Sequence, residues 1–129
     1  MSQVVLDASA ILALLAGEPG AEAVGACLPD AAVSTVNVAE VGAKLVDRGM
    51  KEKDMRVAIG TLGMEVVVFD EDAAYAAAML RDRTRRLGLS LGDRACLALG
   101  AARGLPVLTA DRSWAGLDIG VEIRLIRGT

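Results

Sequence analysis

The sequence predicts a single α/β domain over residues 1–129, with a central, mostly parallel sheet of four or five strands flanked by helices. Short apolar runs alternate with segments of helical periodicity along the chain, without internal repeats or a linker. Hydrophobic residues make up 53% of the chain and aromatic residues only 2%, so the core must consist of Ala, Val, Leu and Ile. That composition suits helices packed on a parallel sheet. A chain of 129 residues can bury such a core without disulfides or a structural metal.

The first half of the chain alternates short strands with amphipathic helices. An apolar run ends at Asp7, and Asp7 or Ser9 can cap the helix that follows, which stops at Gly17. The predicted elements are a strand at 3–6, helices at 10–17 and 21–28, a strand at 32–34 and a helix at 36–47.

The second half repeats this alternation and contains the clearest helix signal in the sequence. Ser90 followed by Asp93 is a capping-box pattern, and apolar residues then recur at helical spacing until Gly104. Asp70 is placed to cap an Ala-rich helix. The predicted elements are a helix at 51–62, a strand at 65–69, helices at 71–87 and 91–103, a strand at 106–109 and an edge strand at 121–126.

Four acidic residues map to strand ends or helix starts on one side of the predicted sheet: Asp7, Glu40, Asp93 and Asp111. In open α/β sheets, ligands bind in the crevice outside the carboxyl ends of the strands. Carboxylates gathered there would repel one another unless a cation were present. Hard Mg²⁺ or Mn²⁺ prefers oxygen ligands, and it can lower the pKa of a bound water and offset charge on a phosphoryl oxygen. The four acids therefore indicate a metal site suited to phosphodiester hydrolysis.

Each acid also has a purely local interpretation. Asp93 completes the capping box, and Asp7 can simply cap the next helix. Glu40 can be a solvated acid favoured by the helix dipole, and Asp111 can be a turn residue before Arg112.

A receiver-like phosphoacceptor site on Asp70 is a weaker alternative. Such a site needs a paired acid after the first strand and a lysine late in the chain. Asp7 is instead followed by Ala8, and the only lysines are Lys44, Lys51 and Lys53.

The absence of histidine excludes several chemistries. No Ser-His-Asp or Cys-His nucleophile, histidine general base or histidine-ligated zinc can form. Residues 88–92 read G-x-S-x-G, but this pattern follows an Arg-rich helix rather than a strand, so Ser90 is interpreted as a helix cap. Cys27 and Cys96 lack metal-ligand spacing and are expected to be reduced core residues of a cytosolic protein.

The N-terminus lacks a basic region, and the longest apolar segment, 10–17, is too short to span a bilayer. Secretion and membrane insertion are therefore not expected. The net charge of −3 does not by itself indicate a nucleic-acid binder.

Arginine is distributed unevenly. Eleven of the fourteen basic residues are arginine, and four of them lie at Arg81, Arg83, Arg85 and Arg86. These side chains can form a solvated helix face, or they can bind RNA phosphates or an acidic partner, because the guanidinium fork matches phosphate geometry. Arg112 lies beside Asp111, closer to the predicted metal site.

Together these residues resemble the PIN-domain family, and more narrowly the VapC-type toxins of bacterial toxin–antitoxin pairs. The resemblance rests on VVLDASAILALLAGEPG, STVNVAEVGAKL, LSLGDRACLALGAARGLPVLTADRSW and VEIRLIR, whose order and spacing agree with the family along the whole chain. It assigns the family's acidic positions to Asp7, Glu40, Asp93 and Asp111, and supporting hydroxyls to Ser9 and Thr109. Residues 111–114 fit the family's pattern.

The resemblance implies a Mg²⁺- or Mn²⁺-dependent endoribonuclease that cuts structured RNA, commonly tRNA or rRNA. It also implies a homodimer and inhibition by a cognate antitoxin, whose tail would pack along a groove of the early helices and could push an arginine toward the acids. Our hypothesis on the mechanism is that Asp7, Asp93 and Asp111 ligate one or two Mg²⁺ ions directly or through water. Glu40 is then a further ligand or orients the attacking water, and Arg112 helps to hold the RNA backbone. A catalytically weak PIN-like module that binds RNA or a partner remains the alternative.

Overall fold

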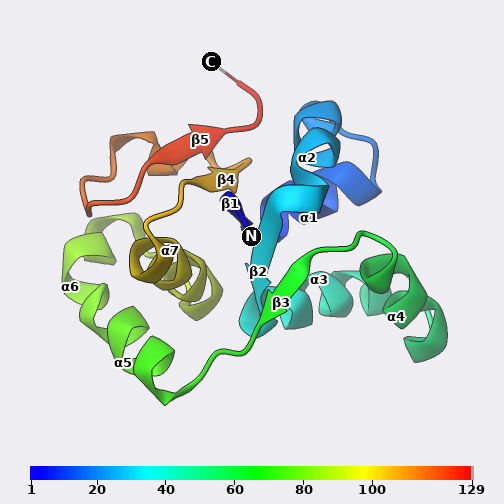
Figure 1. Cartoon of the computed structure of the whole chain (residues 1–129), viewed down its shortest axis with the longest axis horizontal. Helices are drawn as coiled ribbons and strands as arrows, with labels where there is room; N and C mark the ends of the chain where they lie inside the picture. The colour runs from blue at the N-terminus through cyan, green and yellow to red at the C-terminus, as the bar shows by residue number, and fades with distance from the viewer. Residues whose placement is uncertain (129) are drawn as a thin grey trace.

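The computed structural model describes residues 1–128, so only Thr129 of the predicted domain lies outside the described residues. The five strands of these residues form one sheet in the order β3-β2-β1-β4-β5, and every neighbouring pair is parallel (Figure 1). The strands are β1 (Val4–Leu6), β2 (Ala31–Ser34), β3 (Glu65–Val67), β4 (Val107–Thr109) and β5 (Ile123–Leu125). The predicted α/β class is confirmed.

Helices cover both faces of the sheet, with α1 to α4 on one side of Figure 1 and α5 to α7 on the other. The α-helices are α1 (Ala8–Leu15), α2 (Ala21–Cys27), α3 (Thr35–Asp47), α4 (Glu52–Gly60), α5 (Glu71–Met79), α6 (Arg81–Thr84) and α7 (Leu91–Arg103). The described part of the chain also contains three 3₁₀ turns, η1 (Leu28–Asp30), η2 (Arg85–Leu87) and η3 (Arg112–Gly116).

The alternation of side chains along β1 divides the core into two clusters. Val4 and Leu6 face α1, α2 and α3, whereas Val5 faces α7 and Trp114. The three central strands, β2, β1 and β4, are buried along their whole length, which is why they read as continuous apolar runs.

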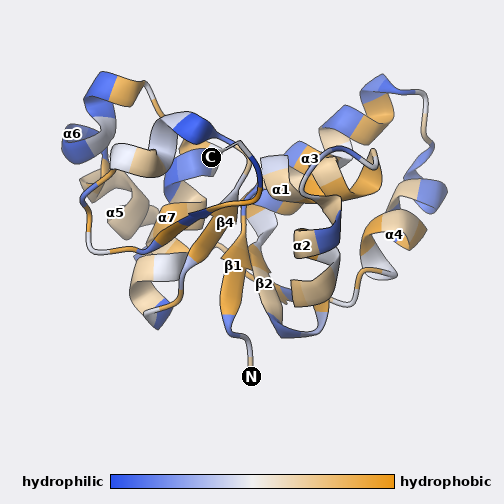
Figure 2. Cartoon of the chain, turned by 90° about the horizontal axis from the view of Figure 1, so that it is seen from above, coloured by the Kyte–Doolittle hydropathy of each residue, from blue (hydrophilic) through white to orange (hydrophobic). Residues whose placement is uncertain are grey.

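All strands of a parallel sheet end on the same edge, and this carboxyl edge holds the residues of interest. In Figure 2, β1 rises from the N-terminus, so the carboxyl edge lies above the sheet, and the hydrophilic α6 lies on that side. Asp7, directly after β1, caps α1, and Ser34, the last residue of β2, caps α3. Two helices therefore begin with a polar capping residue at the same edge of the sheet.

The predicted helix at 71–87 is wrong, because the chain forms α5, α6 and η2 instead. The break follows Met79. Thr84 is buried and donates its hydroxyl to the Leu80 carbonyl, and Arg94 of α7 donates to the Ala77 carbonyl in the last turn of α5. Arg94 thus supplies a donor to the Ala77 carbonyl, which the Arg81 N–H would pair in a continuous helix, whereas the Leu80 carbonyl accepts from both the backbone N–H and the hydroxyl of Thr84. The outer strands are also shorter than predicted, at 65–67 and 123–125.

Among the described residues, no helix combines the length and apolar character that a bilayer crossing requires. Both cysteines are free, as predicted. Cys96 is fully buried, and Cys27 is partly buried against the cluster around Val4.

Candidate functional site

Asp7 is the centre of a hydrogen-bond network at the end of β1. Its side chain is only 3% exposed. Oδ1 accepts from the Ala10 backbone N–H at 2.8 Å, and Oδ2 accepts from the Thr109 hydroxyl at 2.6 Å. The Ser9 hydroxyl lies 2.8 and 2.9 Å from the two carboxylate oxygens. Asp7 is thus the helix cap that the sequence allowed, and it also bonds to the end of the neighbouring strand β4.

The hydroxyls of Ser9 and Thr109 connect this carboxylate to the chain that follows β4. Ser9 Oγ accepts from the Ala110 N–H at 2.9 Å, and Thr109 Oγ1 accepts from the Asp111 N–H at 3.0 Å. The two hydroxyl oxygens are 3.3 Å apart. The position of the Asp7 carboxylate is therefore fixed by contacts from two adjacent strand ends.

Burial makes ionisation of Asp7 unfavourable in the absence of a cation. Burial raises its pKa from the ordinary value of 3.8 to about 6, which outweighs the hydrogen bonds from Thr109, Ala10 and Ser9 that lower it. The negative charge of Asp93 makes a smaller contribution to the same rise in pKa. A cation next to Asp7 would act in the opposite direction.

Asp93 lies in the first turn of α7, where it is a capping residue and the next of the predicted site residues. Its Oδ2 accepts from the Ser90 N–H at 3.0 Å, and its own N–H donates to Ser90 Oγ at 3.1 Å, so the predicted capping box is present. Its charge raises the pKa of both Asp7 and Glu40. The capping interpretation and the functional one therefore apply to the same side chain.

Glu40 lies on α3, whose start follows β2. Burial raises its pKa, the hydrogen bond from Asn37 lowers it, and the charge of Asp93 raises it again. The buried thiol of Cys96, one turn into α7, feels the same charges. Its pKa is raised first by burial and then by the charges of three acids, Asp7, Asp93 and Glu40. We call these three residues the acid cluster.

Asp111 does not join the acid cluster through its side chain. It is exposed, and its Oδ1 accepts from the backbone N–H and the hydroxyl of Ser113 at 2.9 and 2.7 Å. The carboxylate thus stabilises the start of η3, as the turn interpretation predicts. Arg112 is also exposed, and its side chain lies against Gly128, where an added Cβ would come within 2.9 Å of Arg112 Cδ.

Within residues 1–128, no group of three or more acids or cysteines is arranged closely enough to hold a metal ion directly. Of the four acids that were predicted to converge, three lie close enough for their charges to raise the pKa of neighbouring groups. Asp111 is close to them through its backbone, because its N–H bonds to Thr109.

Sequence reasoning missed Asn37 and Gly92. Asn37 is 1% exposed and donates its side-chain amide to Glu40 Oε1 and to the Gly92 carbonyl, at 2.9 and 3.0 Å. The available signal was an amide at a position where helical spacing, with Val41 and Leu45, predicts an apolar residue.

Comparison with known proteins identifies the family. A family model described as the PIN domain matches residues 4–119. The chain belongs to the PIN-domain family. Ribonuclease VapC5 of Mycobacterium tuberculosis is 30% identical to this PIN domain, with an alignment that covers 95% of the chain and 93% of the relative.

Solved structures agree with this assignment. A chain of DNA-bound VapBC from Salmonella typhimurium matches 98% of this PIN domain with a TM-score of 0.76, at 20% identity and over 100% of that chain, and shows the fold. A chain of VapBC-5 from Mycobacterium tuberculosis, described as a member of the VapBC family of toxin–antitoxin systems, matches 99% with a TM-score of 0.60, at 27% identity and over 100% of its length. The resemblance seen in the sequence is confirmed.

The donors of the acid cluster fit a hard divalent cation. They are carboxylate oxygens, which Mg²⁺ and Mn²⁺ prefer, and Mg²⁺ commonly binds through one or two carboxylates with waters completing its shell. A bound cation would lower the raised pKa values of Asp7 and Glu40. The residues present in this PIN domain therefore suit such an ion.

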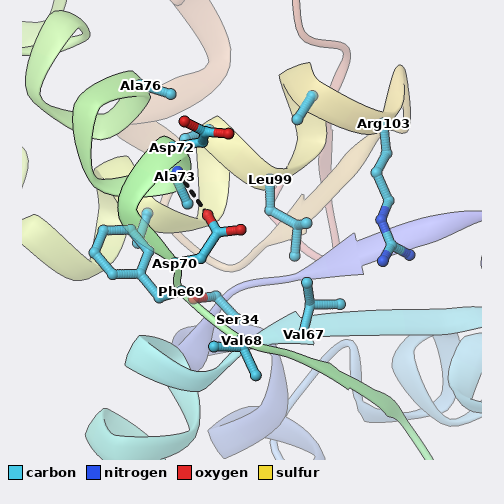
Figure 3. Close-up of a pocket in the computed structure, with 13 residues that line it drawn as sticks. Ser34, Val67, Val68, Phe69, Asp70, Asp72, Ala73, Ala76, Leu99 and Arg103 are labelled. Atoms are coloured by element: carbon cyan, nitrogen blue, oxygen red, sulfur yellow. Dashed lines mark hydrogen bonds between the residues drawn. The ribbon is translucent and has the colours of Figure 1, made fainter.

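Figure 3 shows a separate pocket of about 410 Å³ between β3, α5 and α7. Its walls are mostly apolar, with Asp70 and Arg103 among the lining residues, and it includes none of the acid cluster. The Asp70 carboxylate accepts from the Ala73 N–H at 2.9 Å and caps α5. Asp70 thus has the capping role predicted for it, and the receiver-like alternative gains no support.

Proposed function

We propose that this PIN domain is a Mg²⁺- or Mn²⁺-dependent endoribonuclease that acts in the cytoplasm as the toxin of a VapBC-type pair. The observation that carries the proposal is the buried Asp7 carboxylate, which strand-end hydroxyls hold beside Asp93 although burial and charge both oppose its ionisation. Such an arrangement is stable at neutral pH with a bound cation. The names of the similar proteins, Ribonuclease VapC5 and VapBC-5, support the same activity and role.

In the proposed reaction, the acid cluster holds the metal directly or through water. When bound, the metal supplies an activated water and offsets the charge that develops on the phosphoryl oxygen. Ser9 and Thr109 hold the Asp7 carboxylate in place, and Glu40 is a further ligand or orients the attacking water. Asp111 can be a further ligand through Oδ2, because both hydrogen bonds from Ser113 go to Oδ1, and Arg112 binds the RNA backbone by turning away from Gly128.

The proposed substrate is structured RNA, with tRNA or rRNA as the first candidates, and the proposed regulator is a cognate antitoxin. Similar proteins are described as VapBC and as members of the VapBC family of toxin–antitoxin systems, which supports such a partner, and we propose a homodimeric toxin on the family resemblance alone. A groove of about 560 Å³ between α3 and α4, with apolar walls that include Val38, Met55 and Ile59, suits the apolar part of an antitoxin tail. It lies among the early helices, as the family resemblance implies.

The deciding experiment is incubation of purified protein with total RNA, with and without Mg²⁺ or Mn²⁺. We expect fragments that EDTA prevents, and we expect Asp7→Asn and Asp93→Asn to abolish cleavage while the folded state is retained. Cleavage by both variants at the wild-type rate would disprove the site. RNA binding without metal-dependent cleavage by the wild-type chain would favour the alternative of a binding module.

A further inference from the structure

Asn37 occupies a position in the core that the helix would normally give to an apolar residue. It is the third residue of α3, lies on the buried face with Val41 and Leu45, and is 1% exposed. Its Oδ1 is buried and has no hydrogen-bond partner within residues 1–128. An unsatisfied buried amide oxygen costs stability, so the local fold alone does not favour asparagine here.

The amide nitrogen of Asn37 donates two hydrogen bonds, and these define the orientation of the amide. Nδ2 donates to Glu40 Oε1 at 2.9 Å and to the Gly92 carbonyl at 3.0 Å. Both partners are acceptors, so only the NH₂ group can face them. Asn37 thus connects a carboxylate of its own helix to the first turn of α7, which carries Asp93.

Gly92 completes this arrangement from the α7 side. A Cβ at position 92 would lie 2.2 Å from both carboxylate oxygens of Glu40, so the Glu40 carboxylate occupies the space that any other residue would fill. Gly92 is buried and helical, and it has no positive φ that would require glycine. The close approach of Glu40 is therefore the reason that glycine fits here.

We propose that Asn37 and Gly92 are positioning residues, which hold the Glu40 carboxylate beside Asp93 at the metal-binding edge. We call the set of Asn37, Glu40 and Gly92 the α3–α7 contact. The inference rests on the proposed function only in assigning Glu40 to the metal site. The amide sets the direction of the carboxylate, and the missing Cβ sets how closely it approaches α7.

The first test measures Mn²⁺ binding to the purified full chain by calorimetry, without RNA, and RNA cleavage in parallel. Asn37→Leu keeps the branched shape and removes the unsatisfied oxygen, but it also leaves Glu40 Oε1 without its donor, so the unfolding midpoint is measured to confirm that the variant is folded at the assay temperature. We expect it to weaken Mn²⁺ binding and to lower kcat by roughly 10- to 100-fold, as for other residues that orient metal ligands. Gly92→Ala should do the same by displacing Glu40.

Gly60→Ala is the matched control for Gly92→Ala. Gly60 is the last residue of α4, and a Cβ there meets no atom within 4 Å, so this variant should bind Mn²⁺ and cleave RNA as the wild type does. In a Glu40→Ala background, Asn37→Leu should have no further effect on either quantity. The proposal would be overturned if Asn37→Leu kept the Mn²⁺ affinity and kcat of the wild type. It would also be overturned if Asn37→Leu lowered both quantities by the same factor in the wild type and in the Glu40→Ala background.

A second test requires neither metal nor RNA. In the NMR spectrum of the metal-free chain, the side-chain amide protons of Asn37 should exchange slowly, and Glu40→Ala should remove the protection of one of them. Fast exchange in the wild type would overturn the proposal. Protected protons in a chain that cuts no RNA would instead leave the α3–α7 contact in place and refute the ribonuclease function.

Discussion

At the scale of single residues, the functional candidates in this chain also have structural roles. Asp7 caps α1, Asp93 closes the capping box of α7, and Asp111 stabilises the start of η3. A local explanation of an acid is therefore not an argument against a functional one. Asp7 differs from the other two acids in that it is buried, and a residue that only caps a helix does not need to be buried.

This burial predicts a pH dependence for the metal-free protein. The pKa of Asp7 is raised from 3.8 to about 6, so the folded state binds the proton more tightly than the unfolded state does. The contribution of Asp7 to stability therefore falls as the pH rises from about 4 to about 6, and it stays low above that. The full shift corresponds to about 3 kcal/mol in the free energy of unfolding.

Asp7→Asn should consequently stabilise the metal-free chain at pH 7.5 by up to about 3 kcal/mol, because the amide carries no charge to desolvate. The advantage should disappear near pH 4, where the wild-type carboxyl is protonated. Urea unfolding in EDTA, followed by the fluorescence of the single Trp114, measures both values. An equal stability of wild type and variant at all pH values would show that Asp7 ionises without cost.

At the scale of elements, sequence reasoning succeeded where the signal is local. Short apolar runs predict the strand before Asp7 and the strand that ends at Thr109. The helix between the cap Ser90 and the terminating Gly104 is likewise predicted by residues at its own two ends. The helix predicted at 71–87 failed because its break depends on Arg94, which reaches the Ala77 carbonyl from 17 residues away. No local pattern in the sequence contains that contact.

In Figure 2, α6 lies on the side of the carboxyl edge, at the outer end of the layer formed by α5 to α7, and its arginines are exposed. Arg83 donates to the Asp118 carbonyl and Arg85 to Asp82, so these two are already engaged. Arg81 and Arg86 are the better candidates for RNA phosphates. The double change Arg81→Ala and Arg86→Ala should weaken RNA binding, and it should reduce the slope of log K against log salt by about 0.7 to 0.9 per lost phosphate contact, or about 1.4 to 1.8 in all.

Filter binding of a structured RNA to these variants at several salt concentrations, in EDTA to prevent cleavage, would test this prediction. Arg56→Ala is the matched control, since Arg56 is exposed on α4 and pairs with Glu52. An unchanged salt slope in the double variant would assign these arginines to the solvated helix face instead.

At the scale of the whole molecule, the acid cluster joins elements from both sides of the sheet. Asp7 follows the central strand β1, Glu40 comes from α3 on one side and Asp93 from α7 on the other (Figure 1). The sequence could predict the edge on which these acids lie, because parallel strands share one carboxyl edge. It could not predict that β1 lies between β2 and β4, or that Asp111 turns toward Ser113, because both depend on distant contacts.

A cation bound between these elements should therefore stabilise the whole fold. Binding to the folded state alone raises the free energy of unfolding by about 2.7 kcal/mol at a metal concentration of one hundred times Kd. We expect Mn²⁺ to raise the thermal unfolding midpoint of the wild type, and EDTA to reverse the effect. Asp7→Asn and Asp93→Asn should show little or no increase, whereas Asp54→Asn, which removes an exposed acid of α4, should respond as the wild type does. An equal increase in all four proteins would mean that Mn²⁺ stabilises the chain from elsewhere on its surface, and the acid cluster would then not be the metal site.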